Sequence, residues 1–173
     1  MRLTCFALIA VLTLLSTPLL FAQSDAQKSF DTIKTLSGSW EGTLTTMPVE
    51  PTANGKHAQL SLRVTSMGNA VVHEMKIEGR QDDPITMLYL DSDRLYLTHY
   101  CDAGNRPRMV ARASGDGKTV EFDFVDVAGN MQYGHMDHAV ITAVDENHHI
   151  EDWTYVGPDN KPTHAHFDLH RTK

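Results

Sequence analysis

The sequence has 173 residues, and its 15 lysines and arginines are outnumbered by 22 aspartates and glutamates, which gives a formal net charge of −7. A negative surface repels nucleic acid and anionic lipid, so we expect neither as a partner. The length suits one domain with its own hydrophobic core and does not favour two.

The chain begins with the three-part pattern of a secretory signal peptide. Arg2 precedes an apolar run over residues 6–15, and a second apolar patch ends at Ala22 before polar residues. Residues 16–18 interrupt the run, which therefore falls short of the roughly 20 residues that cross a bilayer. We predict that residues 1–22 are cleaved off and that residues 23–173 form one periplasmic or secreted domain, free of the membrane.

A short amphipathic helix is predicted at the start of this domain. Ser24 is followed three residues later by Gln27, which is the pattern of a capping box, and the predicted helix ends before Gly38. Between them, apolar residues recur at helical spacing: Ala26, Phe30, Ile33 and Leu36.

Beyond Gly38 the apolar period changes to two, which indicates strands. Turn compositions of glycine, asparagine, aspartate and proline separate the strands at short intervals, too short for a crossover helix. Because an open meander would leave two long edges, we predict an all-β fold, an antiparallel up-and-down barrel, with a two-sheet sandwich as the alternative. The about ten predicted strands span roughly 38–46, 57–67, 70–79, 84–91, 93–101, 106–114, 118–126, 131–144, 148–156 and 162–171.

Gly38-x-Trp40 stands on the first strand, directly after the helix, and is similar to the opening of lipocalin-like (calycin) barrels. In that family the tryptophan closes the barrel floor. The resemblance is nearest to bacterial secreted lipocalin-like proteins of unassigned function, and it implies a fold and a cavity rather than a reaction.

The same start, extended to Gly38-x-Trp40-x-Gly42, also resembles nitrobindin-like haem barrels, which have ten strands. These end in a strand with a haem-binding histidine and a later arginine. By its spacing to Arg171, His164 is the residue that corresponds to the haem-binding histidine of those barrels.

The last predicted hairpin separates a polar face from an apolar one. Pairing across its turn sets Asp152 opposite His166 and His148 opposite His170 on one face. On the other face, Trp153 lies opposite Ala165 and Glu151 opposite Phe167. If the apolar face is interior, as burial favours, the histidines point outward, and His164 with them.

The histidine run suggests a metal site as an alternative function. His164, His166 and His170 alternate along one strand, and imidazole and carboxylate ligands suit Zn²⁺. Neighbours at i and i+2 on a strand lie roughly 6 to 7 Å apart, so a neighbouring strand would have to help, through Asp152 or His148. Some periplasmic calycin proteins bind zinc. The other interpretation is a solvated polar face of histidines.

The predicted interior carries the leading hypothesis, which is the binding of a small and mainly apolar molecule. His73 and His99 each alternate with apolar residues, roughly 10 Å apart, and Tyr89 lies on the strand between them. They would orient the ligand, unless each histidine merely bonds a neighbour. The expected walls are aromatic: Trp40, Phe122, Trp153, Tyr155 and Phe167.

Enzymatic activity has no positive signal and remains an alternative. Cys101 is the only cysteine of residues 23–173, and His99 is near it in sequence. Side chains two residues apart on one strand lie parallel, which separates a thiol from its base. Core packing is the simpler explanation for Cys101, and the sequence does not identify a cofactor.

Overall fold

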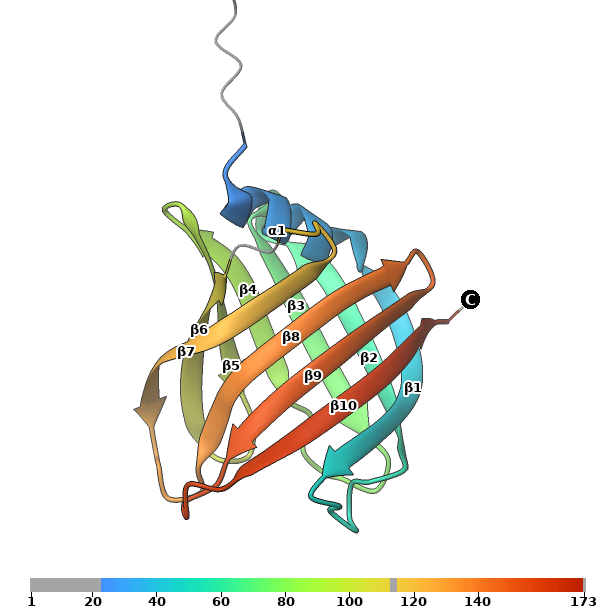
Figure 1. The fold of residues 1–173 in the computed structure, drawn as a ribbon, viewed down its shortest axis with the longest axis vertical. Helices are drawn as coiled ribbons and strands as arrows, with labels where there is room; N and C mark the ends of the chain where they lie inside the picture. The colour runs from blue at the N-terminus through green and yellow to red at the C-terminus, as the bar shows by residue number, and fades with distance from the viewer. Residues whose placement is uncertain (1–22, 113–114, 173) are drawn as a thin grey trace, which may run out of the picture.

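In a computed structural model of the chain, residues 23–112 and 115–172 are described, and the predicted signal peptide lies outside them. Ten antiparallel strands form a closed barrel in which each strand pairs with its neighbours in sequence and β1 pairs with β10 (Figure 1). The predicted fold class is confirmed. The elements are α1 (Asp25–Thr35), β1 (Gly38–Met47), β2 (Lys56–Thr65), the 3₁₀ turn η1 (Ser66–Gly68), β3 (Ala70–Ile77), β4 (Ile85–Asp91), β5 (Arg94–Tyr100), β6 (Asn105–Arg112), β7 (Thr119–Gly129), β8 (His135–Asp145), β9 (His148–Val156) and β10 (Pro162–Arg171).

Helix α1 begins at the predicted cap, where the backbone N–H of Gln27 donates to the Ser24 hydroxyl at 3.2 Å. The second half of the capping box is missing, because the Gln27 amide donates to Asp31 instead, at 2.9 Å. Phe30 and Ile33 are buried on the inner side of the helix. Figure 1 shows α1 lying across one end of the barrel, which it closes.

Trp40 and Arg171 complete this closed end. The buried Trp40 indole donates to the carbonyl of Leu36 at 2.8 Å, and the Arg171 guanidinium lies 4.1 Å from the indole ring centre. Three backbone carbonyls accept hydrogen bonds from that guanidinium, those of Thr35, Ser37 and Glu146. The last strand is thereby tied to the helix and to the β8–β9 turn.

The two glycines of the Gly38-x-Trp40-x-Gly42 motif make room for this closure. A Cβ on Gly38 would collide with the guanidinium of Arg171, and a Cβ on Gly42 would collide with the carbonyl oxygen of Asp168. Gly38 also has a φ of +144°, which other residues rarely adopt. The motif therefore follows from the close approach of β1 and β10.

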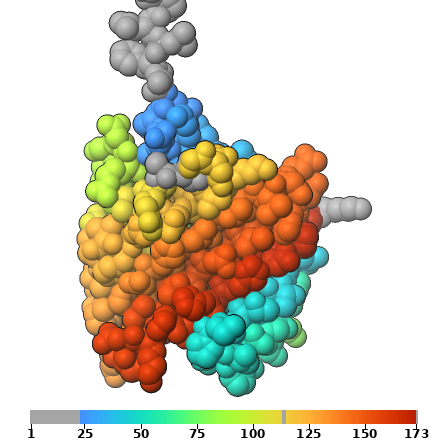
Figure 2. All heavy atoms as spheres, viewed as in Figure 1, coloured from blue at the N-terminus to red at the C-terminus, as the bar shows by residue number. Residues whose placement is uncertain are grey.

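Strands β9 and β10 pair in the predicted register. Asp152 lies opposite His166, His148 opposite His170, and Trp153 opposite Ala165. The apolar side faces the core, so the histidines of β10 lie on the outer surface. Figure 2 shows this outer wall as a continuous surface over the last strands. Among the described residues, the structure has no helix with the length and hydropathy of a membrane crossing.

Candidate functional site: a polar cluster inside the barrel

A carboxylate lies in the barrel interior. Glu151, on β9, has no exposed surface. His73 Nε2 contacts both of its oxygens, at 3.0 and 3.2 Å, while His149 Nε2 contacts Oε1 at 3.2 Å and the Trp153 indole donates to Oε2 at 2.9 Å. Because an ionised carboxylate only accepts hydrogen bonds, both imidazoles present Nε2–H to it.

The surroundings of Glu151 favour its charged form. Burial alone would raise the pKa of Glu151, but the positive charge of His73 and the hydrogen bonds from His149 and His73 outweigh burial and lower that pKa below its usual value. A buried charge is tolerated when it is paired and fully hydrogen-bonded. The interior therefore holds a carboxylate whose two oxygens are both hydrogen-bonded.

His149 links this pair to the closed end of the barrel. Its ring meets that of Trp40 edge-on, with 4.2 Å between the ring centres. Nδ1 of His149 and Nδ1 of His73 are buried and have no partner among the described residues.

His99 is a second buried histidine, and its environment differs from that of His73. Its Nδ1 lies 2.8 Å from the Thr86 hydroxyl, and its Nε2 is buried with no partner among the described residues. Burial, together with the charge of His73, lowers the pKa of His99 to about 4, so the ring is neutral at neutral pH. The free nitrogen can form one uncharged hydrogen bond.

The Trp153 ring lies between the two histidines. Its centre is 5.9 Å from that of His73 and 5.5 Å from that of His99. The space in which a ligand was expected to bridge His73 and His99 therefore holds an indole.

Most of the predicted interior residues do line the interior. Tyr155 is half-buried, on the same side of β9 as Trp153. The residues that are buried as expected are Trp40, His73, His99, Phe122, Trp153 and Phe167.

The placement of Tyr89 in the interior was wrong. Its hydroxyl lies 3.2 Å from that of Thr98, and its ring stacks on Tyr96, its partner across the β4–β5 ladder. Thr86 and Leu88 are the buried residues of β4, so Tyr89 alternates to the outer face.

Glu151, His149 and Thr86 also belong to the site, although the sequence pattern did not predict them. Glu151 was already opposite Phe167 in the predicted register, which the structure confirms. An acidic residue on an inner face was the signal that could have revealed the cluster.

Hollows of about 600 Å³ and about 50 Å³ lie outside the barrel interior. The larger is on the outer side of β1 to β3, among Glu41, Gln59 and Lys76, and the smaller lies between α1 and Thr119. Inside, large side chains including Phe122, Leu97 and Met109 are fully buried and occupy much of the space. Any ligand taken into the interior would have to be small.

The three predicted metal ligands all lie on the outer face, but each has a different partner. His164 contacts the Thr154 hydroxyl at 3.1 Å and His166 contacts Asp152 at 2.7 Å. His170 lies 3.4 Å from Asp168. The structure does not bring these histidines to one point.

The outward direction of His164 also bears on the haem resemblance. The side chain is exposed and lies on the face of β10 opposite to Phe167, which is buried. A haem held inside the barrel would therefore be out of reach of His164. The assignment of His164 as the haem ligand, which the resemblance implied, is wrong in this chain.

Cys101 is half-buried beyond the end of β5. Burial raises the pKa of its thiol, and the charges of Asp82 and Asp102 raise it further. A nucleophilic cysteine needs the opposite, a lowered pKa. The environment of Cys101 thus gives no support to thiol catalysis.

Comparison with known proteins identifies the fold and no function. No family model matches the chain, and no curated protein matches it. Rv2717c from M. tuberculosis is similar in structure, with a TM-score of 0.64 and 13% identity, over 84% of this chain and 98% of that one. A DUF3598-family protein of unknown function from Nostoc punctiforme has a TM-score of 0.54 and 8% identity, over 81% of this chain and 49% of that one.

Proposed function

We propose that the protein is a binding module that holds a small, mainly apolar molecule at the end of the barrel opposite α1. The unpartnered Nε2 of the buried His99 carries this proposal. Buried polar atoms in native proteins are nearly always hydrogen-bonded, so an orphan next to an aromatic ring indicates a missing partner. A ligand with one polar group would supply it.

The position of His99 indicates the route of entry. The 50 Å³ hollow places the start of β7, at Thr119, beside α1. Because the strands alternate in direction, β5 ends at the far end of the barrel, and His99 is its penultimate residue. Tyr155, near the end of β9, and Cys101 lie at that same end. A ligand entering there would reach His99 and Trp153 first.

The chemistry of the site indicates the class of ligand. His99 is uncharged at neutral pH, so it favours a neutral hydroxyl, carbonyl or amide over an anion. The ring of Trp153 provides an apolar contact beside it. The pattern of a few polar groups among apolar walls is that of small-molecule sites.

The first test is native mass spectrometry of the gently purified protein, followed by titration with 1-naphthol, a small aromatic alcohol, in a calorimeter. We expect a bound small molecule or saturable binding of the probe. His99→Leu should weaken that binding about tenfold, the worth of one hydrogen bond of about 1.4 kcal/mol. His166→Leu, on the outer face, is the matched control. Unchanged binding in His99→Leu, or no binding by the wild type, would refute the proposal.

We further propose that the module works after export, since residues 1–22 have the composition of a signal peptide. The intact mass of protein recovered from the periplasm or medium of an expressing bacterium should correspond to a chain that starts at Gln23. Retention of the full-length mass in the cytoplasm would contradict export.

A further inference from the structure

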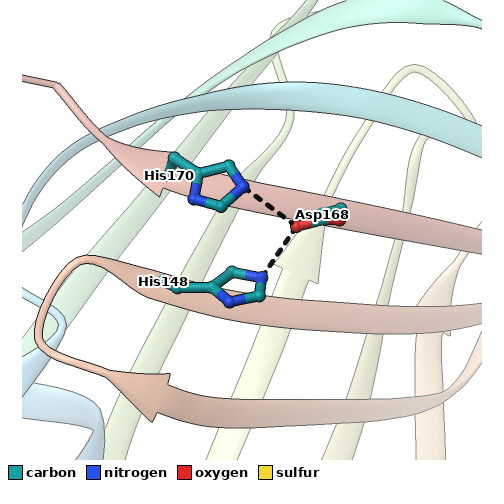
Figure 3. A group of neighbouring side chains, drawn as sticks. All are labelled: His148, Asp168 and His170. Atoms are coloured by element: carbon teal, nitrogen blue, oxygen red, sulfur yellow. Dashed lines mark hydrogen bonds and ion pairs between the residues drawn. The ribbon is translucent and has the colours of Figure 1, made fainter.

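On the outer face of the barrel, two imidazoles converge on one carboxylate oxygen. His148 Nε2 lies 2.8 Å and His170 Nε2 3.4 Å from Oδ1 of Asp168. Figure 3 shows both rings directed at this oxygen, His148 from β9 and the other two residues from β10. The three potential ligand atoms lie within 4.8 Å of one another.

The strand register produces this arrangement. His148 lies directly opposite His170, and their rings stack with centres 4.5 Å apart. Asp168 precedes His170 by two residues and so projects from the same face. We name the group His148, Asp168 and His170 the outer-face triad.

The triad contributes little to the stability of the fold. The side chains of Asp168 and His170 are 54% and 64% exposed and that of His148 is 25% exposed, and ion pairs at such a surface stabilise proteins little. Among the described residues, Asp168 forms ion pairs with these two histidines, and no lysine or arginine neutralises it. A bound cation would therefore balance the negative charge of the Asp168 carboxylate.

A second group of the same kind differs in this respect. Glu121, Asp123 and His138 also lie close together, but Arg112 donates to both carboxylates, at 2.8 and 2.7 Å. A metal ion there would have to displace the guanidinium. The outer-face triad has no such competitor among the described residues.

We propose that the outer-face triad binds a transition-metal ion of the Zn²⁺ class. Two imidazole nitrogens and a carboxylate oxygen suit Zn²⁺ and disfavour Mg²⁺ and Ca²⁺, which prefer oxygen ligands. Tetrahedral bonds of about 2.1 Å put ligand atoms roughly 3.4 Å apart, so small rotations of exposed side chains bring the three into position.

A fourth ligand is available on the adjacent strand. Glu41, on β1, lies directly opposite His170 and faces the same side, where its carboxylate is 3.8 Å from His57. Cross-strand neighbours on one face lie within side-chain reach. Glu41 or a water molecule would complete the coordination.

The test is a Zn²⁺ titration of the metal-free, purified protein against a chromogenic chelator. We expect one equivalent of Zn²⁺ to bind, and His170→Ala and Asp168→Asn each to weaken binding tenfold or more. His166→Ala is the matched control, because it removes an exposed histidine from the same face of the same strand. His138→Ala tests the second group, and both controls should bind as the wild type does.

Several results would overturn the proposal: no binding in competition with the chelator, unchanged affinity in His170→Ala, or an equal loss in His166→Ala. Because His170 is exposed, its variant should fold, and its thermal unfolding should match that of the wild type. Visible absorption of bound Co²⁺ provides a second readout. Its band should be lost in His170→Ala and kept in His166→Ala.

Discussion

Protonation of His99 should destabilise the folded protein as the pH falls below neutrality. In the unfolded chain this histidine takes up a proton near pH 6.5, whereas in the folded barrel its pKa is about 4. The unfolded state therefore binds more protons throughout this window, and stability falls as the pH is lowered through it. One pKa unit is worth about 1.4 kcal/mol, so the full effect is about 3 kcal/mol.

His99→Asn isolates this effect. An asparagine amide can take the place of Nδ1 and keep the hydrogen bond to Thr86, but it does not titrate. We expect the variant to be less stable than the wild type at pH 7.5, because it leaves a small cavity. Urea unfolding from pH 7.5 to 4.5 should show a weaker pH dependence in the variant, by up to about 1.4 kcal/mol per pH unit.

The range from pH 7.5 to 4.5 separates the effect of His99 on stability from that of Glu151. The pKa of Glu151 is lowered from its usual value of 4.5, so its contribution to stability is present above pH 4.5 and is lost only below it. His166→Asn, an exposed substitution, should follow the wild-type pH dependence. Parallel curves for His99→Asn and the wild type would show that His99 is not buried in its neutral form, and the reasoning would fail.

Three further substitutions test the fold and the site. Glu151→Gln removes the buried carboxylate that His73, His149 and Trp153 all contact, and we expect a loss of about 3 kcal/mol or more in urea unfolding at pH 7, with a smaller loss for Asp152→Asn on the outer face. Gly42→Ala introduces a methyl group where the backbone of Asp168 already lies, and should lower the thermal midpoint by several degrees, whereas Gly115→Ala, with open space for a Cβ and no positive φ, should lower it less. In a haemin titration, His164→Ala should behave as the wild type does, because His164 faces outward; loss of a Soret band in that variant alone would contradict the orientation.

The strands and the final hairpin could be predicted because their patterning leaves little choice. In β10, polar and apolar residues alternate from His164 to His170, and the short turn after Val156 restricts the pairing. A slip by one residue would expose Phe167 and Leu169 and bury charges. Burial thus determines the register before any three-dimensional contact is considered.

Tyr89 could not be placed in the same way. The sequence of β4 is apolar at most positions, so its alternation does not distinguish the inner face from the outer one. The pairing with Tyr96 and the bond to Thr98 show the outer position, and both depend on the register with β5.

Glu151 was missed for a different reason. Its partners are His149 and Trp153 on its own strand and His73, which is 78 residues away in the sequence. The hydrophobic pattern of a strand does not show whether a buried acid is paired. Only closure of the barrel brings β3 and β9 to face each other across the interior.

The hydrogen-bonding state of these groups supports the two proposed binding sites. The carboxylate of Glu151 is fully engaged by three side chains and serves the structure of the core. His99 keeps one free nitrogen in an apolar setting, which suits a neutral polar group. Asp168 is engaged through Oδ1 alone, by the half-buried imidazole of His148 and the exposed one of His170, whose protons a metal ion can replace. The interior and the outer face of β9 and β10 are thus suited to different ligands, an uncharged molecule within and a cation outside.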